Sequence, residues 1–216
     1  MAETLSLRAK IEQSPMGAYQ WMIVAMAAIM NLLDGFDVLA LAFTATAIRN
    51  EFGLTRIELG YLLSAGLFGM AAGSLFLAPL ADKIGRRPLL LMAVLLSTIG
   101  MLGSAFISQY QWLGFWRVIT GFGVGGILVG TNVITSEYSS RKWRSFAISV
   151  YAAGFGVGAV LGGMFAVMLQ GEYGWRSVFL AGAILTGLFL VILFIWLPES
   201  IDFLTTKQPK NAEVRL

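Results

Sequence analysis

Three charged side chains lie inside long apolar stretches of this sequence and are candidates for chemistry. Asp34 and Asp37 occur in NLLDGFDVLAL, residues 31–41, and Arg117 occurs in a later apolar run. If these runs cross a membrane, each charge costs about 2.5–3.5 kcal/mol at mid-membrane, or about 8–10 kcal/mol for three unpaired charges. A cost of this size predicts that the three residues pair with one another or serve a function.

The composition indicates that the chain is a membrane protein. Hydrophobic residues make up 57% of the chain and charged residues only 12%, against roughly 25% charged residues in soluble domains. The absence of cysteine and histidine from the sequence excludes disulfides, thiol catalysis, and zinc, haem or Ser-His-Asp sites that need them. We therefore predict no enzyme, metal site or cofactor. The basic residues flank apolar runs rather than forming a stripe, so no nucleic-acid partner is expected.

Six segments are long enough to cross a hydrocarbon core of about 30 Å, which takes about 20 residues of helix. The predicted spans cover residues 19–43, 59–80, 88–107, 112–135, 145–169 and 177–197. We expect an all-α membrane protein with a cytoplasmic N-terminal tail over residues 1–18, a six-helix bundle over 19–197 and a cytoplasmic C-terminal tail over 198–216.

A weak internal repeat relates the two halves of this predicted bundle. A shift of 89 residues superimposes four residues on four others: Gly69, Gly73, Gly85 and Arg87 on Gly158, Gly162, Gly174 and Arg176. Because the second and fifth spans run in opposite directions, the match predicts two inverted three-helix repeats, the construction of many secondary transporters.

Lysine and arginine concentrate on one side of the predicted membrane. With both termini in the cytoplasm, the outside loops hold only Arg49, Arg56 and Arg176, and eleven of the fifteen basic residues lie inside: Arg8, Lys10, Lys83, Arg86, Arg87, Arg141, Lys142, Arg144, Lys207, Lys210 and Arg215. Cytoplasmic loops carry such an excess. We therefore predict a multi-pass protein of the cytoplasmic (inner) membrane with both termini in the cytoplasm.

The predicted loop between the second and third spans, APLADKIGRRPLL at residues 78–90, resembles a motif of the major facilitator superfamily. The motif G-x-x-x-D-[RK]-x-G-[RK]-[RK] is matched at Asp82, Lys83, Gly85, Arg86 and Arg87. Ala78 stands where glycine is usual. The resemblance implies that these residues form a cytoplasmic latch against the other half of the transporter. The partner of Asp82 would then be a helix end or an arginine outside this chain.

Two later segments resemble the same family. RVITGFGVGG, from Arg117, is similar to the signature R-x-x-x-G-x-G-x-G, and Glu137 and Arg144 resemble the E-x(6)-R boundary that follows it. The resemblance implies that these two residues belong to the latch. After the last span, LPESIDFL resembles the P-E-S of the central loop. Together with DGFD, this segment looks most like the aromatic acid:proton symporter group.

The depth of the buried charges predicts a coupling mechanism. At a rise of 1.5 Å per residue, Asp37 and Arg117 both lie roughly 9 Å outward from the midpoints of their spans, so they can pair. Asp34 shares a helix face with Asp37. We expect an aspartate, preferably Asp37, to bind a proton and so free Arg117 for a substrate carboxylate. The family resemblance implies the same roles. A permanent pair that only fixes helix packing is the alternative.

Other polar residues within the predicted spans can face a cavity. We predict that Asn31, Asn132 and Tyr151 contact the substrate together with Arg117, although such side chains also join helices as structural hydrogen-bonding groups.

These observations predict proton-coupled symport of a small, aromatic carboxylate by alternating access. The expected partners are the carboxylate, protons, the lipid bilayer, and a C-terminal six-helix half outside this chain or a second copy. Two alternatives stay open: a sugar or neutral-metabolite porter of the same superfamily, and a non-transporting half-length membrane subunit.

Overall fold

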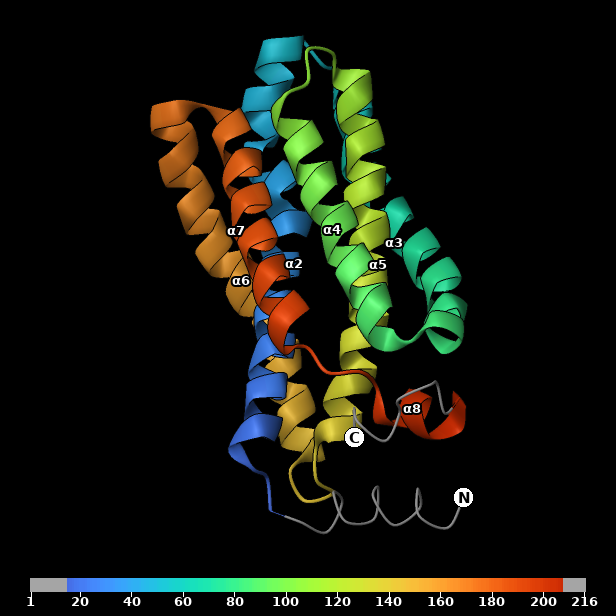
Figure 1. Ribbon diagram of the computed structural model, residues 1–216. Coiled ribbons are helices and arrows are strands. Elements are labelled where there is room, and N and C mark those ends of the chain that lie inside the picture. Colours follow the sequence, from blue (N-terminus) through green and yellow to red (C-terminus); the bar gives the residue numbers. More distant parts are fainter. Residues whose placement is uncertain (1–14, 208–216) are drawn as a thin grey trace.

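The computed structural model describes residues 15–207, which fold into a bundle of helices (Figure 1). The elements are α2 (Ala18–Phe52), α3 (Arg56–Ile84), α4 (Arg86–Ala105), α5 (Tyr110–Tyr138), α6 (Arg144–Tyr173), α7 (Trp175–Trp196) and the short α8 (Ile201–Lys207). Six of these helices, α2 to α7, are long and apolar enough to cross a membrane. The described residues contain no strand. The predicted all-α bundle of six spans is confirmed.

Most of the helices extend past the predicted spans. α2 has 35 residues, about 52 Å at 1.5 Å per residue, which exceeds the roughly 30 Å of hydrocarbon. The first predicted span ends at residue 43 because polar side chains follow soon after in the sequence. The helix continues to Gly53, whose φ of 64° allows its N–H to bond to the carbonyl of Arg49. Residues 1–14 and 208–216 of the predicted tails lie outside the described residues.

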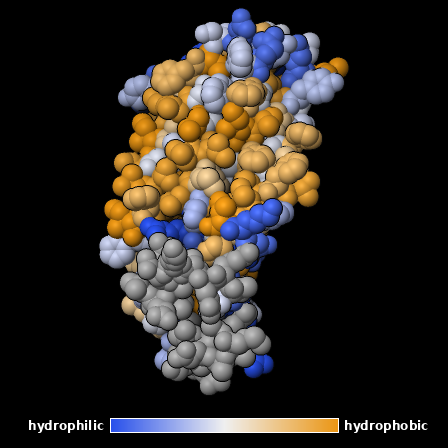
Figure 2. All heavy atoms as spheres, turned by 45° about the vertical axis from the view of Figure 1, so that its right-hand side comes forward, coloured by the Kyte–Doolittle hydropathy of each residue, from blue (hydrophilic) through white to orange (hydrophobic). Residues whose placement is uncertain are grey.

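The chain crosses the bundle alternately, so its loops gather at two ends (Figure 1). The α3–α4 and α5–α6 loops lie at the same end as α8, which we call the α8 end. The loops α2–α3, α4–α5 and α6–α7 lie at the opposite end. Figure 2 shows a broad hydrophobic band on the surface between them, as expected for a bundle whose sides face lipid.

Glycines set the closest contacts between helices. α3 packs most extensively on α5, and α2 packs on α6. A Cβ placed at Gly69 of α3 would run into the backbone of Val118, and a Cβ at Gly158 of α6 would run into the backbone of Leu32. Since lipid provides no hydrophobic drive for helix pairing, close backbone approach and the resulting van der Waals contact hold such bundles together.

These contacts repeat in register between the two halves of the bundle. Residues of α3 map onto α6 by adding 89, whereas residues of α2 map onto α5 by adding 86. The contact of Gly69 with Val118 then corresponds to that of Gly158 with Leu32. A second pair of contacts matches in the same way: Gly121 on Gly66, and Gly35 on Phe155. The inverted repeat therefore extends to the helix contacts.

The turns and ends of the two repeats also correspond. Gly85 and Gly174 have φ angles of 102° and 78°, and each directly precedes the third helix of its repeat. Glu51 and Glu137 are 86 residues apart, near the ends of α2 and α5. At the end opposite α8, Glu51 accepts a hydrogen bond from Trp175 Nε1 at 2.6 Å and forms a 2.8 Å ion pair with Arg176. Glu137 occupies the equivalent place at the α8 end.

We expect Gly158→Ala to destabilise the bundle, because its methyl group would collide with the carbonyl of Leu32. Overpacking of this kind costs about 1–3 kcal/mol, or a few degrees in Tm. The measurement is thermal unfolding in detergent, followed by tryptophan fluorescence. Gly156→Ala is the matched control, because a Cβ at Gly156 of the same helix meets nothing within 4 Å. Equal Tm values for the two variants would contradict the packing role of Gly158.

Candidate functional site

Arg117 of α5 is buried at the centre of the bundle, with 3% of its surface exposed, and its contacts are uncharged. Its Nη1 donates to the main-chain carbonyl of Asp37 at 3.2 Å, and its Nη2 donates to Ser104 Oγ at 3.0 Å. The remaining contacts are Thr120 Oγ1, Met101 Sδ and, in cation–π geometry, the ring of Phe179. Among the described residues, no carboxylate lies within 4.0 Å of the guanidinium.

Asp37 of α2 lies beside Arg117. The two do not form the ion pair that their equal depths in the predicted spans suggested. The Asp37 carboxylate is fully buried, and Oδ2 accepts a hydrogen bond from Ser97 of α4 at 2.8 Å. Oδ1 has no hydrogen-bond partner. The two residues are neighbours, as predicted, but their contact runs through the main-chain oxygen of Asp37. The carboxylate turns away from Arg117 because of the rotation of α2 and because it binds the hydroxyl of Ser97. The sequence did not single out Ser97.

A second buried polar group includes Asn31 and Tyr151. Asn31 Nδ2 donates to the main-chain carbonyl of Tyr151 at 2.8 Å, while Asn31 Oδ1 has no partner. The Tyr151 hydroxyl lies 3.1 Å from Thr131 Oγ1. Asp34 is buried between Asn31 and Asp37 along α2, and its Oδ2 is also without a partner. The structure thus places unpaired acceptor oxygens along one buried stretch of α2.

A narrow cleft reaches Asp37 and Arg117 from the surface between α2, α3 and α5. Its volume is about 30 Å³, enough for one or two water molecules. The exposed side chains of Leu63 and Leu67 stand at its surface. Of the predicted substrate-binding residues, only Arg117 lines this cleft. Asn31 and Tyr151 are buried elsewhere, and Asn132 is exposed on α5.

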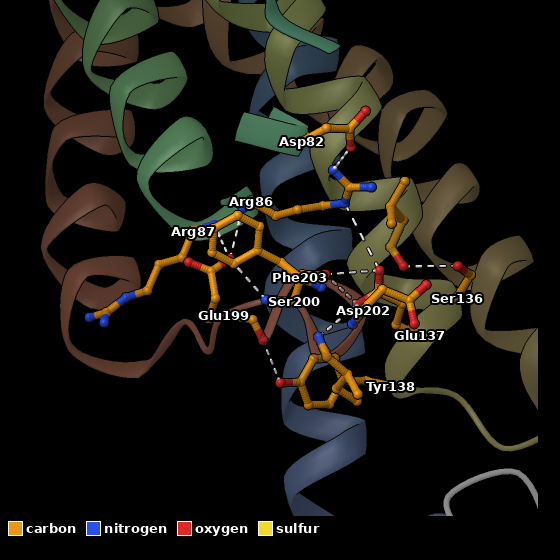
Figure 3. Close-up of polar contacts among 12 residues, drawn as sticks. Asp82, Arg86, Arg87, Ser136, Glu137, Tyr138, Glu199, Ser200, Asp202 and Phe203 are labelled. Carbon is orange, nitrogen blue, oxygen red and sulfur yellow. Dashed lines mark hydrogen bonds and ion pairs between the residues drawn. The ribbon is translucent and has the colours of Figure 1, made fainter. Parts of the chain in front are cut away.

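Three of the predicted latch residues, Asp82, Arg86 and Glu137, lie together at the α8 end, as Figure 3 shows. Arg86 Nη1 forms a 2.9 Å ion pair with Asp82, one helical turn away, and Arg86 Nε lies 3.9 Å from Glu137. The sequence interpretation placed the partner of Asp82 outside this chain or at a helix end. In the structure its partner is Arg86, because the turn at Gly85 keeps the two side chains on the same side. The Asp82 side chain stays 70% exposed.

Glu199 lies beside the predicted latch residues, and the sequence analysis assigned it no role. Its Oε1 accepts hydrogen bonds from the main-chain N–H groups of Arg86 at 2.7 Å and Arg87 at 3.0 Å, so the carboxylate caps the N-terminus of α4. Gly85 makes room for it, since a Cβ there would lie 2.6 Å from Glu199 Oε2. The available signal was the P-E-S segment, whose glutamate follows the last span.

Glu137 caps α8 in a similar way. Its Oε2 accepts hydrogen bonds from the N–H of Ile201 at 2.9 Å and from Ser200 Oγ at 2.8 Å. Two other predicted latch residues, Arg144 at the start of α6 and the exposed Lys83, lie at this end of the bundle. The guanidinium of Arg87 is different, because it points away from the cluster toward α7 (Figure 3).

Comparison with known proteins identifies the family. Residues 27–214 match the model of the Major Facilitator Superfamily. The chain belongs to this superfamily. It is 34% identical over 215 residues to the 4-hydroxybenzoate transporter PcaK of Pseudomonas putida, which covers 100% of this chain and 48% of that protein. It is 35% identical over 204 residues to a gallate transporter of the same species, which covers 94% of this chain and 45% of that protein.

Solved structures confirm the superfamily fold. The xylose transporter XylE from E. coli, in a partially occluded inward-open conformation, matches with a TM-score of 0.82 at 22% identity, over 92% of this chain and 55% of XylE. A bacterial homologue of the human lysosomal transporter Spinster matches with a TM-score of 0.77 at 22% identity, over 86% of this chain and 44% of that one. The chain spans about half the length of the curated relatives. These relatives are named as transporters rather than enzymes, in agreement with the sequence prediction.

We expect Glu199→Ala to loosen the start of α4 and the segment that leads into α8, because the carboxylate that joins them by accepting hydrogen bonds from the N–H groups of Arg86 and Arg87 is lost. Removing a helix N-cap costs about 0.5–2 kcal/mol. Hydrogen exchange of residues 85–90 and 199–207, together with the Tm in detergent, measures the effect. Glu172→Ala removes an exposed carboxylate near the end of α6 and serves as the control. Unchanged exchange of both segments in the Glu199 variant would show that this carboxylate does not hold them together.

Proposed function

We propose that this chain forms one half of a transporter that couples the movement of a small aromatic carboxylate to that of protons. The observation that carries the proposal is that two buried charged groups lie side by side at the cleft without forming an ion pair. Arg117 is a buried cation whose donors meet only uncharged acceptors, and Asp37 beside it has a carboxylate oxygen without a partner. Neither group has the exclusive ion pair that a purely structural role predicts.

The adjacent charges suggest how proton and substrate bind together. With Asp37 ionised, its charge balances that of Arg117, and the pair is neutral as a unit. A proton on Oδ1, the oxygen that Ser97 leaves free, cancels the aspartate charge. Arg117 is then an unbalanced cation and can bind a carboxylate through two parallel N–H donors. Release of the proton restores the internal balance and favours release of the substrate anion.

The names of the relatives favour an aromatic carboxylate as the substrate. 4-Hydroxybenzoate and gallate both carry a carboxylate on an aromatic ring, which is the group that Arg117 can recognise. Because the cleft holds only about 30 Å³, the site must widen or be completed by further surface during transport. Asn31 and Tyr151 would then line the widened site together with Asp34, and the exposed Asn132 would face it from α5.

The curated relatives are about twice as long as this chain, which supports a second six-helix half in the working transporter. We propose that a C-terminal half or a second copy packs here and that the α8 end latches against it. Asp82 is exposed enough to reach such a partner, and Arg86 and Glu137 hold it in place. The exposed Lys83, Arg141 and Lys142 favour a cytoplasmic α8 end in the inner membrane.

Asp37→Asn should abolish accumulation driven by a pH gradient while leaving membrane insertion and substrate counterflow intact, because the amide cannot bind and release a proton. Uptake of labelled 4-hydroxybenzoate into vesicles measures this, with the chain alone and together with a second half. Hexose serves as the competing substrate class.

Full accumulation by Asp37→Asn would remove Asp37 from coupling, and the same test on Asp34→Asn would then decide for or against Asp34. Hexose counterflow, or no uptake in either arrangement, would contradict the proposed function.

Arg117→Lys should weaken carboxylate binding by about tenfold, or roughly 1.4 kcal/mol, because lysine keeps the charge but lacks the planar pair of donors. The measurement is the concentration dependence of 4-hydroxybenzoate counterflow. Arg176→Lys, at the end opposite α8, is the matched control. Unchanged affinity in the Arg117 variant would show that this arginine is structural.

A further inference from the structure

Arg87 belongs to the predicted latch motif, but its side chain points away from the other residues of that motif. Its main-chain N–H bonds to Glu199, but its guanidinium extends away from the cluster (Figure 3), and Nη2 donates to the main-chain carbonyl of Phe194 at 2.7 Å. Within residues 15–207, no carboxylate lies within 4.0 Å of this group. A permanently charged side chain therefore stands where α4 begins and α7 ends, and no carboxylate of the described residues pairs with it.

An apolar groove starts next to this guanidinium. It has a volume of about 360 Å³ and runs between α4 and α7, and its walls are Leu91, Met92, Leu95, Leu190, Val191 and Phe194. Arg87, Leu91 and Leu95 follow one another at four-residue spacing, so they share a face of α4. Phe194 both lines the groove and provides the carbonyl that Arg87 binds. The charge and the groove thus form one continuous surface.

The ends of α4 and α7 put Arg87 at the level expected for the lipid headgroups. α4 begins at Arg86, and α7 ends at Trp196, which is exposed. An exposed tryptophan at a helix end is typical of the membrane–water interface. A guanidinium at this level can reach a phosphate above it, while the groove below lies in the hydrocarbon region.

We propose that the α4–α7 groove is a binding site for an anionic phospholipid. One acyl chain lies along the apolar walls, and the guanidinium of Arg87 pairs with the phosphate through charge-assisted hydrogen bonds. The apolar walls accept any acyl chain, so the selectivity for an anionic lipid comes from the charge of Arg87. One basic residue near a membrane surface supplies about a fivefold preference for anionic over neutral lipid. The proposal does not depend on which solute is transported.

The test compares lipids retained by the whole chain after purification from mixed vesicles of phosphatidylglycerol and phosphatidylcholine with identical acyl chains. Native mass spectrometry should show about fivefold more phosphatidylglycerol than phosphatidylcholine on the unmodified chain. Arg87→Gln should remove this preference. Arg141→Gln removes an exposed charge from the same end and should retain it. Arg87→Lys, which keeps the charge, should preserve most of the preference and covers the case that Arg87→Gln fails to fold.

Three further measurements test the groove, the charge and the identity of the occupant. Leu95→Trp fills the groove and should lower the retention of both lipids. An Arg87→Gln variant with unchanged lipid preference would overturn the proposal. So would displacement of the lipid by inorganic phosphate alone, which would indicate a free-anion site. Loss of lipid when a second six-helix half is bound would show that the groove is a protein interface.

Discussion

Backbone contact through glycine is the constraint on which the rest of this bundle depends. Gly35 lies between the two buried aspartates of α2, and its Cα faces the carbonyl of Phe155 on α6 so closely that no side chain fits. This contact fixes the rotation of α2 about its own axis. Asp37, two residues further on, then points to the other side of the helix, toward Ser97 of α4. The position of the candidate proton site is therefore a consequence of packing.

The two charged regions of the molecule are built on different principles. At the centre, Arg117 and Asp37 are each held by uncharged groups, so their partners can change without breaking a strong ion pair inside the protein. At the α8 end, Glu199 and Glu137 are bound to main-chain N–H groups at the starts of α4 and α8. Carboxylates at helix N-termini are fixed by the geometry of the helix. The central site is therefore suited to exchanging hydrogen-bond and charge partners. The α8 end is suited to holding α4 and α8 in place.

The inverted repeat explains why similar devices occur at both ends of the bundle. Glu51 near the end of α2 and Glu137 near the end of α5 occupy equivalent places. Glu51 bonds to Trp175 and Arg176 at the start of α7. Glu137 lies 3.9 Å from Arg86 Nε at the start of α4 and accepts a hydrogen bond from the N–H of Ile201 in α8. A single sequence shift of 89 residues detects only part of this relation. α2 and α5 correspond at 86 residues instead, because the connection between α5 and α6 has five residues against three between α2 and α3, and α6 begins one residue earlier than α3 does relative to the repeat.

The sequence alone determined the six spans, the superfamily and the residues worth attention, because hydropathy, motif spacing and the cost of buried charge are local properties of the chain. The sequence placed Asp37 and Arg117 at the same depth in the membrane, and in the structure the two residues are neighbours. Only the tertiary structure decided that Arg117 binds the main-chain oxygen of Asp37, that Glu199 caps α4 and that Arg87 turns toward α7. The physical reason is that a side chain's partner depends on helix rotation and on atoms distant in sequence, and the close glycine contacts that set this rotation exist only in the folded bundle.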